Sequence, residues 1–469
     1  MVGITAYGAY VPMLRLSLSA IGGGAPKPGG PEKAVANWDE DAVTMAVAAA
    51  TDALRGIDRS TVDAVLFAST SYAFKEKQGA AIVAKALDLR RDVYTADLGD
   101  TLRAGTNALR AAYDMVKAGS AKRVLVTVGE TRMAAPRTGL EAAIGDGAAA
   151  FLVGDEGVAL AITAAHSISD EIIDVWRTEG DPFVHAWEDR FVVDHGYRTC
   201  VKEAVTGLLQ KAGLTPKSVT RAVFYGPDAR SLGTVAKECG LDPKTQLADP
   251  LFGKVGNCGA AFAPLLLASA LAQTKAGETL LLASYGDGAD AFVLEATPQV
   301  ERLEGQRGVA WHLARRGEFR SYDMYLRFRQ LLATEHDRRA GAGLSATKHF
   351  RDRDSDVTLL AQKCTQCGQA QFPRQRVCFQ CYAKDAFEPI RLSDRVGTVK
   401  SFTFDNFAGS PNPPLVAGIV DVEGARLYLQ MTDVDPKEVK LGMPVELTFR
   451  KIHEAGGTPN YFWKSTPLR

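Results

Sequence analysis

Residues 1 to about 298 alternate continuous apolar runs with alanine-rich stretches, and this alternation constrains the fold more than any other feature. The apolar runs have no polar alternation, as expected for strands covered on both faces, and the clearest are 64–68, 123–128 and 279–283. Apolar residues at helical spacing occupy 41–56, 106–117 and 200–212. The pattern predicts an α/β architecture.

The same region divides into two similar halves, 1–165 and 166–298. Each half contains a helix, a strand, a turn with a special residue, a long helix and a closing strand. Gly145-Asp146-Gly147-Ala148 in the first half is echoed by Gly286-Asp287-Gly288-Ala289 in the second. The echo predicts a duplicated unit.

Length and charge exclude several classes of protein. A chain of 469 residues predicts two or three domains. Lysine plus arginine and aspartate plus glutamate number 55 each, so no overall field favours a nucleic acid or an anionic membrane. No apolar run is long enough to cross a bilayer, and the N-terminus lacks a signal-peptide pattern. We therefore expect a cytoplasmic protein.

Four of the seven cysteines form two pairs, Cys364-x2-Cys367 and Cys378-x2-Cys381, separated by ten residues. Two such turns supply the four thiolates of a tetrahedral zinc site. Because protein thiolates fill all four positions, the predicted Zn²⁺ is structural rather than catalytic.

The second part of the chain differs in composition from the first. Residues 299–350 alternate arginines with aromatics, which suits either a polyanion-binding stripe or, as we favour, a helical linker with its arginines in solvent. We expect a zinc ribbon over 351–395 and an OB-type β-barrel over 396–469, with strands at 396–404, 415–422, 426–431 and 445–449. Basic residues are few in this barrel, which argues against nucleic-acid binding.

The stretch Asp97-Leu98-Gly99-Asp100-Thr101-Leu102-Arg103-Ala104-Gly105 reads as a strand end, a tight turn and a helix start. It resembles the nucleophile turn of the thiolase superfamily, closest to hydroxymethylglutaryl-CoA synthase and the initiating ketoacyl synthases. The resemblance implies a five-layer thiolase fold, a CoA thioester as substrate and a dimer formed across the nucleophile-bearing strand. In those families a cysteine at the helix start is acylated, whereas here the position holds Leu102.

Further segments resemble hydroxymethylglutaryl-CoA synthase over nearly all of 1–298. They are Ile173-Asp174-Val175-Trp176-Arg177, Phe224-Tyr225-Gly226-Pro227-Asp228-Ala229-Arg230, Gly256-Asn257-Cys258-Gly259 and Ser284-Tyr285-Gly286-Asp287-Gly288. Read through this resemblance, the catalytic histidine is replaced by Tyr225, and the glutamate falls in Ser69-Thr70-Ser71 and is absent. A covalent route through Leu102 is excluded, since leucine cannot be acylated.

Several candidates remain, and each has a structural alternative. Tyr225 can act as a general acid or merely bond a carbonyl, and Asn257 can polarise a thioester carbonyl or stabilise its turn. Asp100 and Asp228 can serve as bases or cap helices. For substrate binding, the resemblance points to the CoA phosphates for Arg230 and to the old catalytic pocket for Tyr285 and Leu102, although a solvated Arg230 fits nearly as well. We expect Cys258, beside Asn257, to be a buried inert thiol.

Two functions fit these residues. The first is an enzyme that makes or breaks a C–C bond beside a CoA thioester without an acyl-enzyme, which resembles the thiolase-superfamily aldolases accompanied by a zinc-ribbon and OB domain. The second is a catalytically silent CoA-binding subunit that pairs with an active thiolase. The expected assembly is a homodimer or a hetero-oligomer with a thiolase.

Overall fold

The computed structural model describes residues 1–187, 189–303, 306–332, 345–455 and 457–468. The chain divides into two compact units, Met1–Asn37 with Asp41–Tyr325 and Trp38–Glu40 with Leu326–Arg469. Part of the expected linker, residues 333–344, lies outside the described residues. Across the described ranges, no helix combines the length and the apolar character that a membrane span requires.

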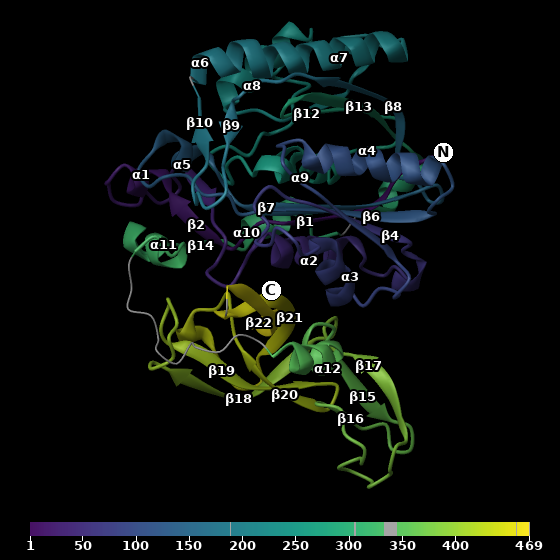
Figure 1. The fold of residues 1–469 in the computed structure, drawn as a ribbon, viewed down its shortest axis with the longest axis vertical. Helices are drawn as coiled ribbons and strands as arrows, with labels where there is room; N and C mark the ends of the chain where they lie inside the picture. The colour runs from purple at the N-terminus through teal and green to yellow at the C-terminus, as the bar shows by residue number, and fades with distance from the viewer. Residues whose placement is uncertain (188, 304–305, 333–344, 456, 469) are drawn as a thin grey trace. The chain divides into compact units, whose positions relative to one another are not determined.

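The first unit has two strand layers that alternate with three helix layers (Figure 1). Nine strands hydrogen-bond in the order β11-β12-β13-β8-β1-β7-β6-β4-β5. Their bounds are β1 Gly3–Tyr10, β4 Ala64–Ala68, β5 Tyr94–Leu98, β6 Arg123–Glu130, β7 Gly147–Gly154, β8 Leu160–Ser169, β11 Arg221–Phe224, β12 Thr279–Tyr285 and β13 Gly288–Ala296. β8 joins the two layers, because its start pairs with β1 and its whole length pairs with β13. The duplicated five-layer α/β fold is thereby confirmed.

The helices explain why the strands read as unbroken apolar runs. The outer helices are α2 Ala42–Ala53 and α3 Gly79–Ala86 on one side and α7 Thr199–Ala212 and α8 Ala229–Glu238 on the other, with α4 Ala104–Lys117 and α9 Phe262–Leu271 between the strand layers (Figure 1). α9 buries nearly every side chain because it packs between the two strand layers. β4 is likewise buried along its whole length.

Smaller elements complete the first unit. They are α1 Leu18–Ile21, α5 Gly139–Ala143, α6 Asp189–Phe191, α10 Gly308–Ala314, α11 Tyr322–Phe328, β2 Leu14–Ser17, β3 Glu32–Ala34, β9 Val175–Trp176, β10 His185–Ala186 and β14 Gly317–Glu318. The arginine-rich segment returns to this unit: β14 pairs with β2, and the hydroxyl of Tyr322 donates to the buried carboxylate of Glu141.

In the second unit, α12 Ala346–Asp356 precedes the three-stranded sheet of the ribbon. Its strands are β15 Leu360–Cys364, β16 Ala370–Gln371 and β17 Phe387–Arg391. Residues 38–40 also belong to this unit, where Asp39 pairs with buried Lys464 at 2.9 Å and Glu40 pairs with buried Arg450.

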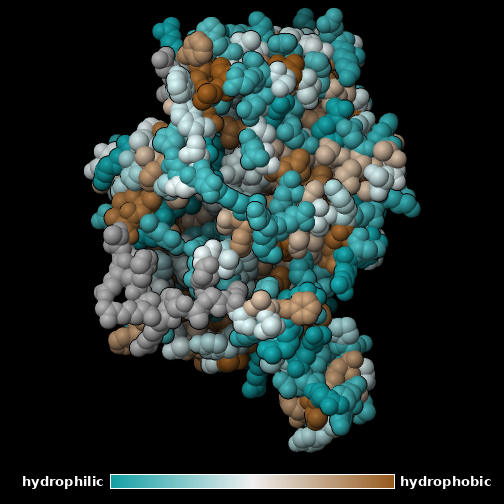
Figure 2. Space-filling view, viewed as in Figure 1, coloured by the Kyte–Doolittle hydropathy of each residue, from teal (hydrophilic) through white to brown (hydrophobic). Residues whose placement is uncertain are grey.

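The barrel has five strands in the order β20-β19-β18-β21-β22. Their bounds are β18 Gly397–Asp405, β19 Leu415–Val422, β20 Ala425–Gln430, β21 Pro444–Ala455 and β22 Thr458–Pro467. A parallel bridge between Met431 and Ser465 closes the sheet, since it joins the end of β20 to β22. The sequence predicted the first four strands but not β22. On the face seen in Figure 2 the surface is mostly hydrophilic, and its apolar side chains lie in small groups.

Candidate functional site

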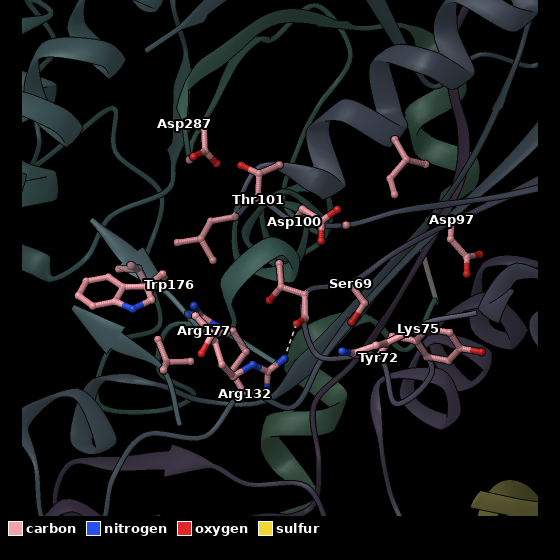
Figure 3. A pocket seen from close by; sticks show the side chains of 18 of the residues that line it. Ser69, Tyr72, Lys75, Asp97, Asp100, Thr101, Arg132, Trp176, Arg177 and Asp287 are labelled. Carbon is pink, nitrogen blue, oxygen red and sulfur yellow. Dashed lines mark hydrogen bonds between the residues drawn. The ribbon is translucent and has the colours of Figure 1, made fainter. Parts of the chain in front are cut away.

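A cavity of about 910 Å³ opens in the first unit where strand ends from both halves meet. Its wall comes from the loop after β4, the turn after β5, Arg132 after β6, the segment 171–179 and the β12–β13 loop (Figure 3). Arg177 ties two of these parts together, because its Nη2 donates to the carbonyl of Thr70 at 2.7 Å. Residues far apart in the sequence therefore share one pocket.

Leu102 lines this cavity from the turn between β5 and α4 and is 8% exposed. Asp100, within this turn, has a left-handed backbone conformation with φ 66°. The β12–β13 loop packs directly against the turn. A Cβ at Gly286, whose φ is +152°, would lie 2.8 Å from the backbone nitrogen of Leu102, so only glycine fits there. The backbone at Leu102 is thus closely packed against the β12–β13 loop.

Arg103 anchors the same turn to the second half of the fold. Its Nη1 donates to the carbonyl of Ile168 at 2.9 Å and to the carboxylate of Asp290 at 3.1 Å. Thr106 donates to the other oxygen of Asp290 at 2.7 Å. These buried contacts hold the helix start rigidly beside the cavity.

Asp174 is the carboxyl group that best suits proton transfer here. It lines the cavity, is 7% exposed, and interacts electrostatically with Tyr285, whose buried hydroxyl has no hydrogen-bond partner within the described part of the chain. Burial raises the pKa of Asp174, and the interaction with Tyr285 acts in the opposite direction. Burial and the charge of Asp174 raise the pKa of Tyr285, which therefore remains a hydrogen-bond donor.

Tyr285 sits in a cluster of three tyrosines behind the cavity wall. Its ring centroid lies 5.5 Å from that of Tyr197 and 6.2 Å from that of Tyr225. A Cβ at Gly196, within the π-helical segment Val192–Arg198, would lie 2.5 Å from the Tyr285 hydroxyl. The absence of a side chain at Gly196 therefore leaves room for the hydroxyl of Tyr285.

Tyr225 and Asn257 are brought together, but neither lines the cavity. The Asn257 side chain bonds its own surroundings: Nδ2 donates to the carbonyl of Gly226 at 3.0 Å, and Oδ1 accepts from the amide of Gly259 at 2.8 Å. Burial raises the pKa of Tyr225. The side-chain amide of Asn257 therefore stabilises the turn that contains it.

The other predicted residues are divided between the cavity and the surface. Asp100 is exposed and lines the cavity. Asp228 and Arg230 are exposed at the start of α8 and do not line it. The Asp228 carboxylate caps that helix, accepting from the amides of Arg230 at 2.8 Å and Ser231 at 2.9 Å.

Three buried groups escaped the sequence reasoning as candidates: Asp174, Arg132 and Glu130. Glu130 carries no motif, yet its carboxyl accepts from the hydroxyls of Thr70 at 3.0 Å and Ser71 at 2.9 Å. A carboxyl from β6 thus lies at the loop where the resemblance places the missing glutamate. Asp174 lies in a segment that resembles the family, but only its burial identifies it as a candidate for proton transfer.

The two cysteine pairs of the second unit converge. Sulfur atoms of Cys364 and Cys381, and of Cys367 and Cys378, are 3.6 Å apart, and all four lie within 4.8 Å of one another. Zn–S bonds of about 2.3 Å in a tetrahedron require sulfurs roughly 3.8 Å apart. The cluster therefore fits a zinc ion with four thiolate ligands.

The remaining cysteines are unsuited to nucleophilic catalysis. Burial raises the pKa of Cys200 and of Cys239 to about 12, and it also raises the pKa of fully buried Cys258. The reactive form of a cysteine is the thiolate, so all three are inert thiols at neutral pH.

Comparisons with known proteins follow the same division of the chain. The family model "3-Oxoacyl-[acyl-carrier-protein (ACP)] synthase III C terminal" matches residues 209–294. Hydroxymethylglutaryl-CoA synthase of Methanocaldococcus jannaschii is 32% identical over 70% of this chain and 99% of its own length. This chain belongs to the hydroxymethylglutaryl-CoA synthase family. The enzyme of Archaeoglobus fulgidus is 34% identical over the same shares.

Two further family models match the second unit, which lies outside the region shared with the synthases. They describe the rubredoxin-like zinc ribbon domain of ChsH2, at residues 358–388, and its C-terminal OB-fold domain, at 390–450. The expected zinc ribbon and OB-fold are thereby confirmed.

Solved structures support the fold. An HMG-CoA synthase complexed with CoA has a TM-score of 0.63 at 19% identity, over 74% of this chain and 92% of that one. The 3-oxoacyl-[acyl-carrier-protein] synthase III of Aquifex aeolicus has a TM-score of 0.55 at 21% identity, over 63% of this chain and all of that one.

Proposed function

We propose that this protein cleaves, or in reverse forms, the C–C bond between the α and β carbons of a β-hydroxyacyl-CoA, without an acyl-enzyme. One observation carries the proposal: the cavity presents an inert Leu102 together with a buried carboxyl, Asp174, whose pKa burial raises. The CoA complex of a related synthase supports a CoA thioester as the ligand class.

The chemistry needs a base and a place for negative charge. The carboxylate of Asp174 removes the proton of the β-hydroxyl, and the hydroxyl oxygen becomes a carbonyl as the Cα–Cβ bond breaks. The electron pair moves into the thioester, giving an enolate that is protonated at the α carbon by the acid form of Asp174. The products are an aldehyde or ketone and a shortened acyl-CoA.

The start of α4 suits the developing enolate. Thr101 and Leu102 line the cavity immediately before the helix, whose first amide groups have no side-chain cap. The partial positive charge of a helix N-terminus stabilises an anion placed there. The rigid anchoring by Arg103 keeps this end in position without reorganisation.

Mass spectrometry of the protein with a panel of β-hydroxyacyl-CoAs tests the proposal. We expect turnover by this protein alone, a ketone or aldehyde product, and no mass added to the protein. A covalent acyl adduct would contradict it. Turnover only after addition of a thiolase would support the second function, a CoA-holding subunit, which the lack of an acylable side chain at residue 102 also favours.

Replacing Tyr285 by phenylalanine is expected to lower kcat/KM about tenfold. It should also shift the acid limb of the pH profile to higher pH. The hydroxyl opposes the rise in the pKa of Asp174, so its removal leaves that pKa higher and demands a higher pH for the carboxylate. The check is a kcat/KM profile against pH, with Tyr428→Phe on exposed β20 as control. If the acid limb of the variant lies at the same pH as that of the native protein, Tyr285 does not influence the pKa of the base.

We also propose a homodimer formed along β5. This strand is an edge of the nine-stranded ladder and leads into the nucleophile turn, and its Tyr94 is 58% exposed. An uncovered edge strand readily pairs with another copy. We expect a sedimentation mass near twice the 50.3 kDa chain, and a shift toward monomer in Tyr94→Lys but not in Tyr428→Lys. A monomeric native protein would contradict the proposal.

A further inference from the structure

Two segments with little regular structure face each other across the cavity. Residues 69–78 contain no helix or strand, and residues 171–179 contain only β9; the structure describes both segments completely. Every residue of 171–179 lines the cavity, as do most residues of the facing loop. Figure 3 shows Trp176 at one side of the cavity and Tyr72 at the other. The segment 171–179, which we call the strap, therefore follows the cavity along its whole length.

Two contacts join the strap to the facing loop. Arg177 Nη2 donates to the carbonyl of Thr70 at 2.7 Å (Figure 3). Two residues further along the strap, the carboxylate of Glu179 pairs with the ammonium group of Lys75. All four residues line the cavity, so both contacts run from one of its walls to another.

The strap is the part of this wall that can move. The side chains of Lys75 and Glu179 are 63% and 82% exposed, and an ion pair in solvent contributes little stability. Segments without a hydrogen-bonded backbone ladder also open locally at low free-energy cost. The start of the facing loop is anchored, because buried Glu130 accepts hydrogen bonds from the hydroxyls of Thr70 and Ser71. Opening therefore requires only the strap to move.

The side chains at the centre of the site are nearly shut off from solvent. Leu102 and Asp174 line the cavity, yet they are only 8% and 7% exposed. Loops that close over an active site exclude water and open to admit the substrate. The conformation described here is closed around these two residues.

We propose that the strap is a lid. Its contacts with Thr70 and Lys75 hold the cavity closed, and a ligand reaches Leu102 and Asp174 only after both contacts break. The inference goes beyond the proposed function and does not depend on it, because any ligand of the cavity needs the same access.

A thiol introduced at residue 102 measures the opening directly. Leu102→Cys is the parent variant, and among the described residues no native cysteine lines the cavity. N-Ethylmaleimide and the larger pyrene maleimide both react with the thiolate, so the ratio of their rates does not depend on the thiol pKa. Mass spectrometry of the labelled protein gives both rates. We expect Arg177→Gln with Glu179→Gln, added to the parent, to raise the large-to-small ratio about fivefold.

The matched control is Glu156→Gln, added to the same parent. It removes an exposed carboxylate whose ion-pair partner, Arg123, does not line the cavity. The rate ratio should stay at the parent value. Exchange of the charges, Lys75→Glu with Glu179→Lys, should bring the ratio back from that of Glu179→Gln toward the parent value.

Two labelling results would overturn the inference. One is an equal rate ratio in the double strap variant and the parent. The other is a parent thiol that the large reagent modifies as fast as it does in urea-unfolded protein. Circular dichroism checks that each variant is folded.

Hydrogen exchange replaces labelling if Leu102→Cys does not fold. In the otherwise native chain, Arg177→Gln with Glu179→Gln should accelerate exchange over residues 171–179, and Glu156→Gln should not. Equal exchange in the native chain and the double variant would also overturn the inference. Neither readout needs turnover, so a failure to detect C–C cleavage leaves this test unaffected.

Discussion

Asp174→Asn is expected to lower kcat for C–C cleavage by about 10²- to 10⁴-fold, the range that a general base contributes. Asparagine keeps the size of the side chain and cannot accept the β-hydroxyl proton. The native kcat/KM should fall as the pH decreases through the pKa of Asp174, which burial places above its usual range. Steady-state kinetics over a pH series measures both effects. Asp114→Asn, exposed on α4, is the control.

Stability separates this loss from misfolding. Because the folded-state pKa of Asp174 is raised, the folded protein favours the neutral form, and its stability contribution declines as pH rises through that pKa. The neutral asparagine avoids this decline, so urea unfolding above that pH should show Asp174→Asn at least as stable as the native protein. A variant that is active and equally stable would show that another group is the base.

The second large effect concerns the cysteine cluster. We propose that one structural Zn²⁺ is held by the cysteines of the ribbon, and we expect Cys378→Ser to abolish its retention and unfold the ribbon. A metal that organises a small domain contributes on the order of 10 kcal/mol or more to its folding. Elemental analysis should find one zinc per native chain and far less in the variant, with a matching rise in protease sensitivity over 358–388.

Cys239→Ser provides the control, since this buried cysteine is far from the cluster in sequence and belongs to the first unit. It should retain zinc. Chelation of the native protein should reproduce the effect of Cys378→Ser and be reversed by added zinc. A native chain without zinc, or a Cys378→Ser ribbon as protease-resistant as the native one, would contradict a structural metal.

Much of the fold follows from local pattern. The unbroken apolar runs predicted β4 and β12 because strands between helix layers need no polar face. β22 escaped notice because its exposed and buried residues do not alternate, and because Pro459 and Pro467 argue against a strand. Only its pairing with β21 and the bridge at Ser465 define it.

The candidate site is harder to predict, because its chemistry depends on burial rather than on motif. Asp174 acquires its raised pKa from burial, and Tyr285, which acts on it, is the last residue of β12, far from Asp174 in the sequence. Arg132 is buried and lines the cavity, a property of the whole fold that no spacing reveals. The sequence predicted Asp228 as a candidate base, but its carboxylate accepts hydrogen bonds from the first amides of α8 and therefore caps that helix.

The leucine at the helix start has a consequence for chemical vulnerability. Enzymes that work through an acylated cysteine are inactivated when alkylating agents or peroxide consume that thiol. Here the corresponding side chain is Leu102. The three cysteines outside the ribbon, Cys200, Cys239 and Cys258, are buried. The catalysis that we propose for this cavity is therefore expected to continue under oxidising or thiol-modifying conditions, with the ribbon as the redox-sensitive part of the chain.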